Sequence, residues 1–242
     1  MEKALTNDNE RLKDVTELLG SAKNDPEKYF VVFDLDGTLT NYNTTYDFIG
    51  YLLLHINPSK YALYVLAIPL FLMTDLIRKV IRSNLDISKL FALKFIKGIS
   101  QNVMYKVART YSSYVLKDIK SRRKSILELI ENCSRNYKVF IISKTLDPLK
   151  FIGQMLTIQI ITSKIGYVDL KVESLEYDIN KKLVIEKLAK FYQLHPLLIV
   201  SDDKEDMLEI FPIKVLVKNS RGVVDKFLRC RFPGKELLRY EK

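Results

Sequence analysis

The feature that most constrains this chain is a short apolar run ending in two aspartates, Tyr29-Phe-Val-Val-Phe-Asp34-Leu-Asp36-Gly37-Thr38-Leu-Thr40. Segment 30–33 is β-branched and aromatic throughout, which is typical of a strand covered on both faces of a parallel sheet. Asp34 and Asp36 are two positions apart, so strand alternation would point both carboxylates the same way. Two converging carboxylates at such a strand end are costly unless a cation or phosphate chemistry uses them. Gly37 allows a sharp turn close to a ligand, and Thr38 can hydrogen-bond that turn.

A second apolar run, Lys138-Val-Phe-Ile-Ile-Ser143, predicts a strand that ends in a hydroxyl group. A serine at this place can hydrogen-bond a phosphoryl oxygen. The next residue, Lys144, opens a turn that continues into Pro148. Lys144 is therefore either a phosphate-binding cation or a solvated loop lysine.

A lysine begins the amphipathic segment Lys181-Lys-Leu-Val-Ile-Glu-Lys-Leu, which predicts a helix that packs one face on the sheet. A cation is unfavourable at a helix N-terminus, so its position is explained if an anion lies nearby. Lys181 and Lys182 are both candidates for that cation.

The last strand pattern, His195-Pro-Leu-Leu-Ile-Val-Ser201, runs into three acids, Asp202, Asp203 and Asp206. Carboxylate oxygens in this setting suit a hard cation such as Mg²⁺. As a bare acidic loop the segment would mean little by itself.

In this order the four segments resemble the four motifs of the haloacid dehalogenase superfamily, whose members are mostly phosphohydrolases. The resemblance implies an α/β fold with a Rossmann-like parallel sheet core covered by helices, and an inserted all-helical cap. It also departs from the family pattern, because Lys144 replaces a small residue, Ser201 replaces Gly and Asp203 replaces Ser.

The resemblance further implies a two-step phosphoryl transfer through a covalent aspartyl phosphate, with Mg²⁺ as cofactor. Asp34 would be the nucleophile and Asp36 the general acid and base. Mg²⁺ would be held by Asp34, Asp36 (through its backbone carbonyl) and Asp202, while Asp203 and Asp206 would support the metal loop. The implied phosphate-binding residues are Gly37, Thr38, Ser143, Lys144 and Lys181.

We expect three regions along the chain. Residues 1–28 would form an N-terminal helical extension, residues 29–41 and 123–242 the hydrolase core, and residues 42–122 the cap. Within the cap, segments 88–100 and 101–120 are predicted to be helices separated by a turn at 97–100.

The stretch 34–49, the apolar segment after it and Phe95-Ile-Lys-Gly-Ile-Ser100 are together similar to phosphoserine-phosphatase-like hydrolases, the branch that includes the bacterial C-type phosphatidylglycerophosphate phosphatases. Segment 48–74 carries one formal charge, Lys60, but Pro58 and Pro69 interrupt it, and its unbroken apolar run is shorter than a spanning helix requires. Two alternatives remain open for this segment, contact with a membrane surface or burial as the inner helix of the cap.

Charge is concentrated in the same region. Segment 78–124 contains 13 basic residues and 2 acids, whereas the whole chain carries a formal net charge of +10. Beside an apolar segment, this charge would be attracted to anionic headgroups by roughly 1 kcal/mol per well-placed basic side chain. Solvated helix faces are the alternative, and a nucleic-acid partner is disfavoured because no recognition motif accompanies the charge.

The predicted function is a Mg²⁺-dependent phosphomonoester hydrolase acting on a lipid or membrane-proximal phosphate. One alternative is a phosphatase of a soluble metabolite such as phosphoserine. Another is a membrane- or nucleic-acid-binding module with a vestigial hydrolase core. The chain has only two cysteines, far apart, which favours a cytoplasmic location, in solution or peripheral at the membrane. No protein partner is implied.

Overall fold

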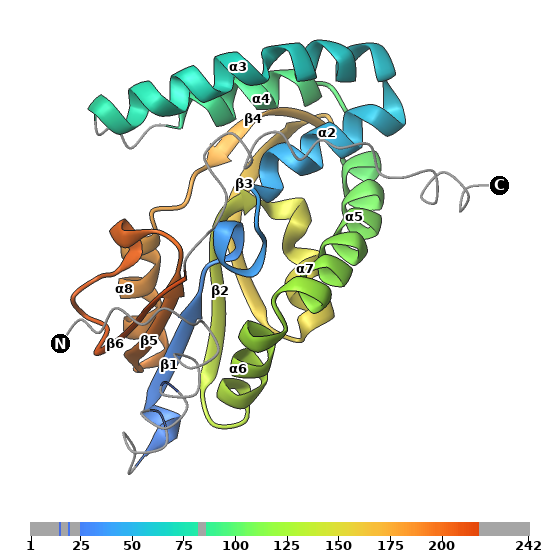
Figure 1. Cartoon of the computed structure of the whole chain (residues 1–242). Helices are drawn as coiled ribbons and strands as arrows, with labels where there is room; N and C mark the ends of the chain where they lie inside the picture. Colours follow the sequence, from blue (N-terminus) through green and yellow to red (C-terminus); the bar gives the residue numbers. More distant parts are fainter. Residues whose placement is uncertain (1–14, 16–18, 20–24, 82–85, 218–242) are drawn as a thin grey trace.

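The computed structural model describes residues 25–81 and 86–217, together with Val15 and Leu19 (Figure 1). Most of the predicted N-terminal extension, residues 1–28, lies outside the described residues. The two described positions within it, Val15 and Leu19, are helical and buried in the main core. A short 3₁₀ turn, Pro26–Lys28, leads into the first strand. Residues 218–242 of the predicted core also lie outside the described part.

The centre of the molecule is a six-stranded sheet with the spatial order β4-β3-β2-β1-β5-β6. All neighbouring pairs are parallel except β3 and β4, which form an antiparallel edge. The prediction of a parallel α/β core is therefore confirmed. The strands are β1 (Tyr29–Phe33), β2 (Lys138–Leu146), β3 (Gln159–Val168), β4 (Lys171–Tyr177), β5 (His195–Ser201) and β6 (Ile213–Leu216).

The apolar run of β1 supplies both faces of this sheet. Val31 and Phe33 pack into one hydrophobic cluster, while Phe30 and Val32 pack into another on the opposite face. All four side chains are at most 2 % exposed. Such a strand reads as continuously apolar because neither side contacts water.

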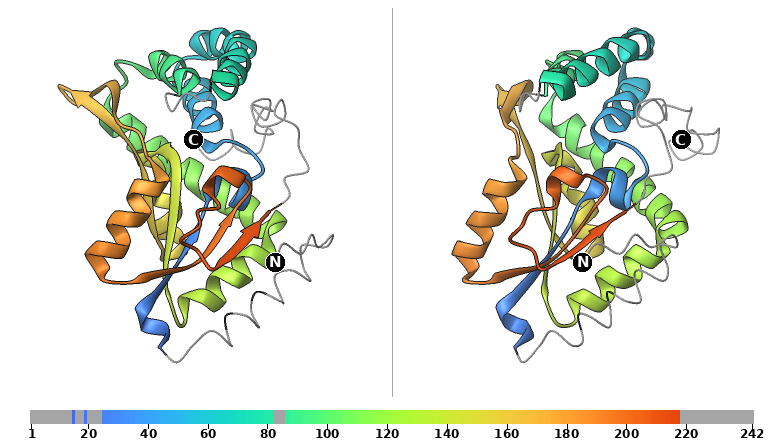
Figure 2. Two further views of the ribbon diagram at one scale, coloured as in Figure 1. Left: turned by 90° about the vertical axis from the view of Figure 1, so that its left-hand side faces the viewer. Right: turned by 60° about the vertical axis from the view of Figure 1, so that its left-hand side comes forward.

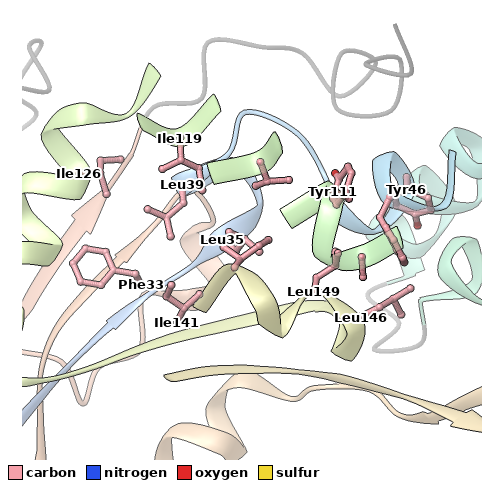
Figure 3. Packing of buried hydrophobic residues seen from close by; sticks show 14 of the residues in the cluster. Phe33, Leu35, Leu39, Tyr46, Tyr111, Ile119, Ile126, Ile141, Leu146 and Leu149 are labelled. Carbon is pink, nitrogen blue, oxygen red and sulfur yellow. The ribbon is translucent and has the colours of Figure 1, made fainter. Parts of the chain in front are cut away.

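Helices cover both faces of the sheet (Figure 2). Of the helices in the described part of the chain, α8 covers one face, whereas α6, α7 and the lower part of α5 cover the other, where Phe33, Ile126 and Ile141 meet (Figure 3). Four successive helices follow β1 before the chain enters α6 and then β2. The helices are α2 (Thr44–Ile56), α3 (Pro58–Ile81), α4 (Ile87–Ile96), α5 (Gln101–Arg122), α6 (Lys124–Ser134), α7 (Phe151–Leu156) and α8 (Lys181–Tyr192).

The inserted segment is helical, as predicted, and α2, α3 and α4 lie together beyond the carboxyl end of the sheet (Figure 1). The two helices expected at 88–100 and 101–120 are confirmed as α4 and α5, with the turn between them at 97–100. The expectation that Pro69 interrupts the apolar stretch is wrong, because α3 continues through it. Pro69 is exposed, and buried neighbours such as Tyr64, Ile68 and Phe71 hold the helix from its other side. The division into domains itself stays a prediction.

The antiparallel edge of the sheet reaches the inserted helices. The amide of Gly98 donates to the carbonyl of Val172 at 2.8 Å, and the amide of Gln101 donates to the carbonyl of Leu170 at 2.7 Å. An ion pair between Lys97 and Glu173 lies beside these bonds. The β3–β4 hairpin thus fixes the turn between α4 and α5. Among the described residues, no helix is long and apolar enough to cross a membrane.

Candidate active site

The first predicted aspartate follows the last residue of β1 directly. Its amide donates to the carbonyl of Val200 in β5 at 2.9 Å, so Asp34 is fixed where two central strands end. The side chain of Asp34 is buried, and its Oδ1 accepts a hydrogen bond from Lys181 Nζ at 2.8 Å. These two residues are 147 positions apart in sequence. The structure therefore brings the predicted nucleophile and the predicted cation together.

Lys181 is the first residue of α8, as predicted. The side chain of Asn180 caps this helix by accepting a hydrogen bond from the amide of Leu183. The ammonium group of Lys181 also contacts Asp206 Oδ2 at 2.5 Å. Lys182, the alternative cation, is exposed. One ammonium group thus pairs with two carboxylates. These carboxylates are the nearby anions that explain a lysine at the start of a helix.

Burial dominates the electrostatics of this pair. It raises the pKa of Asp34 to about 7; the charge of Lys181 lowers this pKa, and the nearby carboxylates of Asp206 and Asp36 raise it. Burial alone would lower the pKa of Lys181, but the charges of Asp34 and Asp206 outweigh it and raise that pKa. Burial therefore outweighs the attraction of Lys181 in setting the pKa of Asp34.

Asp36 lies in the turn Leu35–Leu39 rather than in the strand. The expectation that strand alternation orients both aspartates is wrong, because β1 ends at Phe33. Asp36 Oδ1 accepts hydrogen bonds from Thr44, at 2.8 Å from the amide and 2.7 Å from the hydroxyl. Burial raises the pKa of Asp36 although both bonds to Thr44 lower it. A raised pKa favours the protonated form of this carboxyl, as a general acid requires.

Gly37 and Asp202 are packed directly against each other. A Cβ atom at position 37 would lie 2.1 Å from Asp202 Oδ2, and Gly37 has φ of 85°, which disfavours other residues. The amide of Asp202 donates to Thr38 Oγ1 at 2.9 Å, and Asp202 acts electrostatically on Asp36. The predicted metal loop therefore adjoins the predicted phosphate loop.

Asp203 and Asp206 occupy different places around this loop. Asp203 accepts a hydrogen bond from the amide of Glu205 and begins the 3₁₀ turn Lys204–Asp206. Asp206 accepts a bond of 2.6 Å from Ser201 Oγ in addition to its ion pair with Lys181. Ser201, which replaces a family glycine, thus holds Asp206 in place.

The expectation that the second strand ends at Ser143 is wrong. The strand β2 shifts register after Ile142 and pairs again at Leu146 with Ser163 of β3. Ser143 is buried within this irregular segment, and its Oγ accepts a bond from the amide of Thr145 at 3.2 Å. The carbonyl of Lys144 faces a buried lysine that is described below.

The charges of the site fit a divalent cation. Asp34, Asp36, Asp202 and Asp206 supply four carboxyl groups, with Lys181 as the ammonium group paired to two of them. Within the described residues, no three Asp, Glu, His or Cys side chains are grouped to hold a metal ion. The implied ligand set needs only two carboxylates and one backbone carbonyl, so its oxygen donors still suit Mg²⁺.

One group at the site was not found by the sequence reasoning. Lys89 of α4 is buried, and its ammonium group donates to three acceptors: the carbonyl of Lys144 at 2.5 Å, Ser163 Oγ at 2.9 Å and Asp178 Oδ1 at 2.6 Å. Burial lowers the pKa of Lys89, partly offset by Asp178. This lysine ties α4 to β2, to β3 and to the segment that precedes Lys181. Its acceptors lie 55 to 89 positions away, so no local pattern announces it.

We expect Lys89→Met to destabilise the protein by about 3 kcal/mol, because it leaves Asp178 largely buried without its cation. Thermal unfolding should show a melting temperature about 6 to 12 °C lower. Lys97→Met is the matched control, since it breaks an ion pair whose two side chains are 55 % and 46 % exposed. That exposed pair contributes at most about 1 kcal/mol. Equal losses in the two variants would contradict the assignment of Lys89.

Fold and site together define an α/β protein with a buried aspartate that contacts a lysine at the carboxyl end of a mostly parallel sheet. Residues 31–150 match the family model described as haloacid dehalogenase-like hydrolase. The predicted superfamily and the prediction of a hydrolytic enzyme are confirmed. A comparison with curated proteins finds no match.

Several solved structures are similar at low sequence identity, and the first two described here share the fold. A protein of unknown function from Bordetella pertussis Tohama I has a TM-score of 0.55 and 16% identity over 74% of this chain and 84% of its own. A HAD family hydrolase from Salmonella enterica subsp. enterica serovar Typhi has a TM-score of 0.51 and 14% identity over 86% and 70%. A probable phosphoserine phosphatase from Vibrio cholerae has a TM-score of 0.49 and 12% identity over 86% and 62%.

Proposed function

We propose that this protein is a Mg²⁺-dependent phosphomonoester hydrolase that works through an aspartyl phosphate on Asp34. The observation that carries the proposal is the contact between the buried Asp34 carboxylate and Lys181 Nζ, with Asp36 alongside. A carboxylate placed at a sheet end beside a cation can attack phosphorus while the cation balances charge on the phosphoryl oxygens. Family membership supports the hydrolytic class.

In the first step an Oδ atom of Asp34 attacks phosphorus, and the bond between phosphorus and the leaving alcohol oxygen breaks. Asp36 gives its proton to that oxygen. In the second step Asp36 takes a proton from water, the water oxygen attacks phosphorus, and the bond to Asp34 breaks to release inorganic phosphate. The raised pKa of Asp36 and its two bonds from Thr44 support this double role.

Lys181 is proposed to bind the phosphoryl group together with Ser143, Lys144, Thr38 and the backbone of Gly37. Mg²⁺, when bound by Asp34, Asp202 and the Asp36 carbonyl, would neutralise charge on the phosphoryl oxygens. Asp203 and Asp206 are proposed to keep the Asp202 loop in place, since both make bonds within it.

The substrate class is proposed to be a phosphate ester carried by a lipid or presented beside a membrane. The similarity of the inserted segment to that of C-type phosphatidylglycerophosphate phosphatases supports this choice. The basic and apolar character of the segment supports it as well. A soluble metabolite such as phosphoserine is the alternative substrate.

The test is phosphate release from phosphatidylglycerophosphate in mixed micelles, from phosphoserine and from an aryl phosphate. We expect the highest kcat/KM on the lipid, and we expect loss of all three activities when a chelator removes Mg²⁺. Activity that returns with added Mg²⁺ separates metal removal from unfolding. Preference for phosphoserine would favour the soluble metabolite, and no turnover of any ester would indicate a vestigial site.

A further inference from the structure

The helix α3 has two faces of opposite exposure. Tyr64, Ile68 and Phe71 are at most 3 % exposed and pack inward, where Tyr64 donates a hydrogen bond to the carbonyl of Tyr46. The opposite side carries large apolar residues in contact with solvent, which we name the α3 outer face. Its members and their exposed fractions are Leu63 (59%), Leu66 (77%), Leu70 (49%), Met73 (61%) and Ile77 (49%).

These five side chains form one continuous stripe. They follow each other at intervals of three and four positions, so they lie on one side of the helix. The stripe from Leu63 to Ile77 is about 21 Å long at the rise of an α-helix. Every exposed residue from position 62 to position 73 is apolar. An apolar surface of this extent indicates an interaction site rather than scattered surface residues.

The location of α3 leaves this face open. In both views of Figure 2 the helix lies farthest from the sheet, with α2 and α4 between them. Its inner face is occupied by α2 and α4, as the ring contacts of Phe71 with Tyr46 and Phe95 show. Nothing in the described part of the chain covers the outer face.

We propose that the α3 outer face docks on the surface of an anionic lipid bilayer. Charge decides between lipid and a second copy of this chain. Segment 78–124, which begins in α3 and continues the chain beyond it, contains 13 basic residues and 2 acids. Lys60 at the start of α3, and Lys94 and Lys97 at the end of the neighbouring α4, are exposed. Pairing two such faces would bring two strongly basic segments together, whereas anionic headgroups attract both.

The mode of docking follows from the helix itself. It exposes apolar side chains on one side only, because its other side is packed on α2 and α4, and none of the described helices is suited to span a membrane. Such a helix lies in the interface with its apolar side in the acyl boundary. The inference deepens the membrane-proximal part of the proposed function, but vesicle binding is measured without turnover, so the two can fail separately.

The experiment is flotation of the full-length protein with vesicles of phosphatidylcholine alone or with about one third phosphatidylglycerol. We expect flotation with the anionic vesicles, little with the neutral ones, and weaker binding as salt screens the charges. The variant Leu66→Asp with Met73→Asp should reduce the partition coefficient at least about tenfold. Circular dichroism should show an unchanged fold, since both side chains are exposed.

The matched control is Phe191→Asp with Ile210→Asp, which adds the same charge at exposed apolar positions far from α3 in the sequence. It should bind anionic vesicles as the unmodified protein does. Equal losses of vesicle binding in the two double variants would overturn the proposal. The proposal would also be overturned if the unmodified protein floated with neither kind of vesicle. A dimer that only the α3 variant dissociates, without lipid binding, would assign the face to a second copy instead.

Discussion

Asp34→Asn is expected to reduce kcat by at least about 10⁴-fold, because an amide cannot form the covalent intermediate. The side chain keeps its size, and the amide oxygen can still accept a hydrogen bond from Lys181. Phosphate release under saturating Mg²⁺ and substrate is the measurement. Asp169→Asn makes the same chemical change in the β3–β4 turn and should retain full activity. Turnover by Asp34→Asn near the level of the control would refute the mechanism.

The same variant should be more stable than the unmodified protein when Mg²⁺ is absent. Burial raises the pKa of Asp34 from its ordinary value to about 7. Stability from its protonated form is therefore complete below about pH 4 and is lost as the pH rises through about 7. Asn stays neutral at every pH, so we expect the melting temperature at pH 8 to rise by at least about 3 °C. A lower value at pH 8 would show that the charge of Asp34 stabilises the fold.

The main parts of the site could be predicted because they depend on regular structure. Asp34 and Asp202 each follow a central strand, and parallel strands bring their carboxyl ends to one edge of the sheet. Lys181 begins a helix, where a cation is unfavourable unless an anion lies nearby. Local pattern together with the resemblance to the superfamily motifs was sufficient to select these three residues. Their catalytic roles stay predictions.

The parts that could not be predicted depend on irregular backbone or on long-range packing. The orientation of Asp36 results from a turn with non-helical φ and ψ, which no period describes. Thr44, which binds Asp36, follows the helix-capping residue Asn43 and could have been found from that signal. Lys89 had no such signal, since its acceptors come from three other elements.

The apolar segment shows why composition alone left two alternatives for the inserted region. Residues 48–74 contain two helices with different surroundings. Most of α2 is buried, as a cap helix should be, whereas α3 buries one side and exposes the other. Residues 61–73 of α3 are apolar or aromatic on both sides of the helix, so no amphipathic pattern marks the boundary of this stretch with solvent. Only the packing of Tyr64, Ile68 and Phe71 distinguishes the buried side of α3 from the exposed side.

Lys181→Met is expected to lower kcat by about 10² to 10⁴-fold, because the phosphoryl oxygens lose their direct cation. A second effect separates this role from a structural one. Lys181 lowers the pKa of Asp34, so its removal should raise that pKa further. Since the nucleophile must be ionised, the rise of kcat/KM with pH should move to higher pH. The measurement is the pH profile of the residual activity.

Lys182→Met is the matched control, because the adjacent residue has the same side chain but is exposed. It should leave both the rate and the pH profile unchanged. Asp206 would remain bonded to Ser201 in the Lys181 variant, so the loop carrying Asp202 should keep its place. A rate loss without any change in the pH profile would mean that Lys181 acts on the loop rather than on Asp34. Equal losses in the two variants would mean that the helix start, and not the ammonium at position 181, is what the reaction requires.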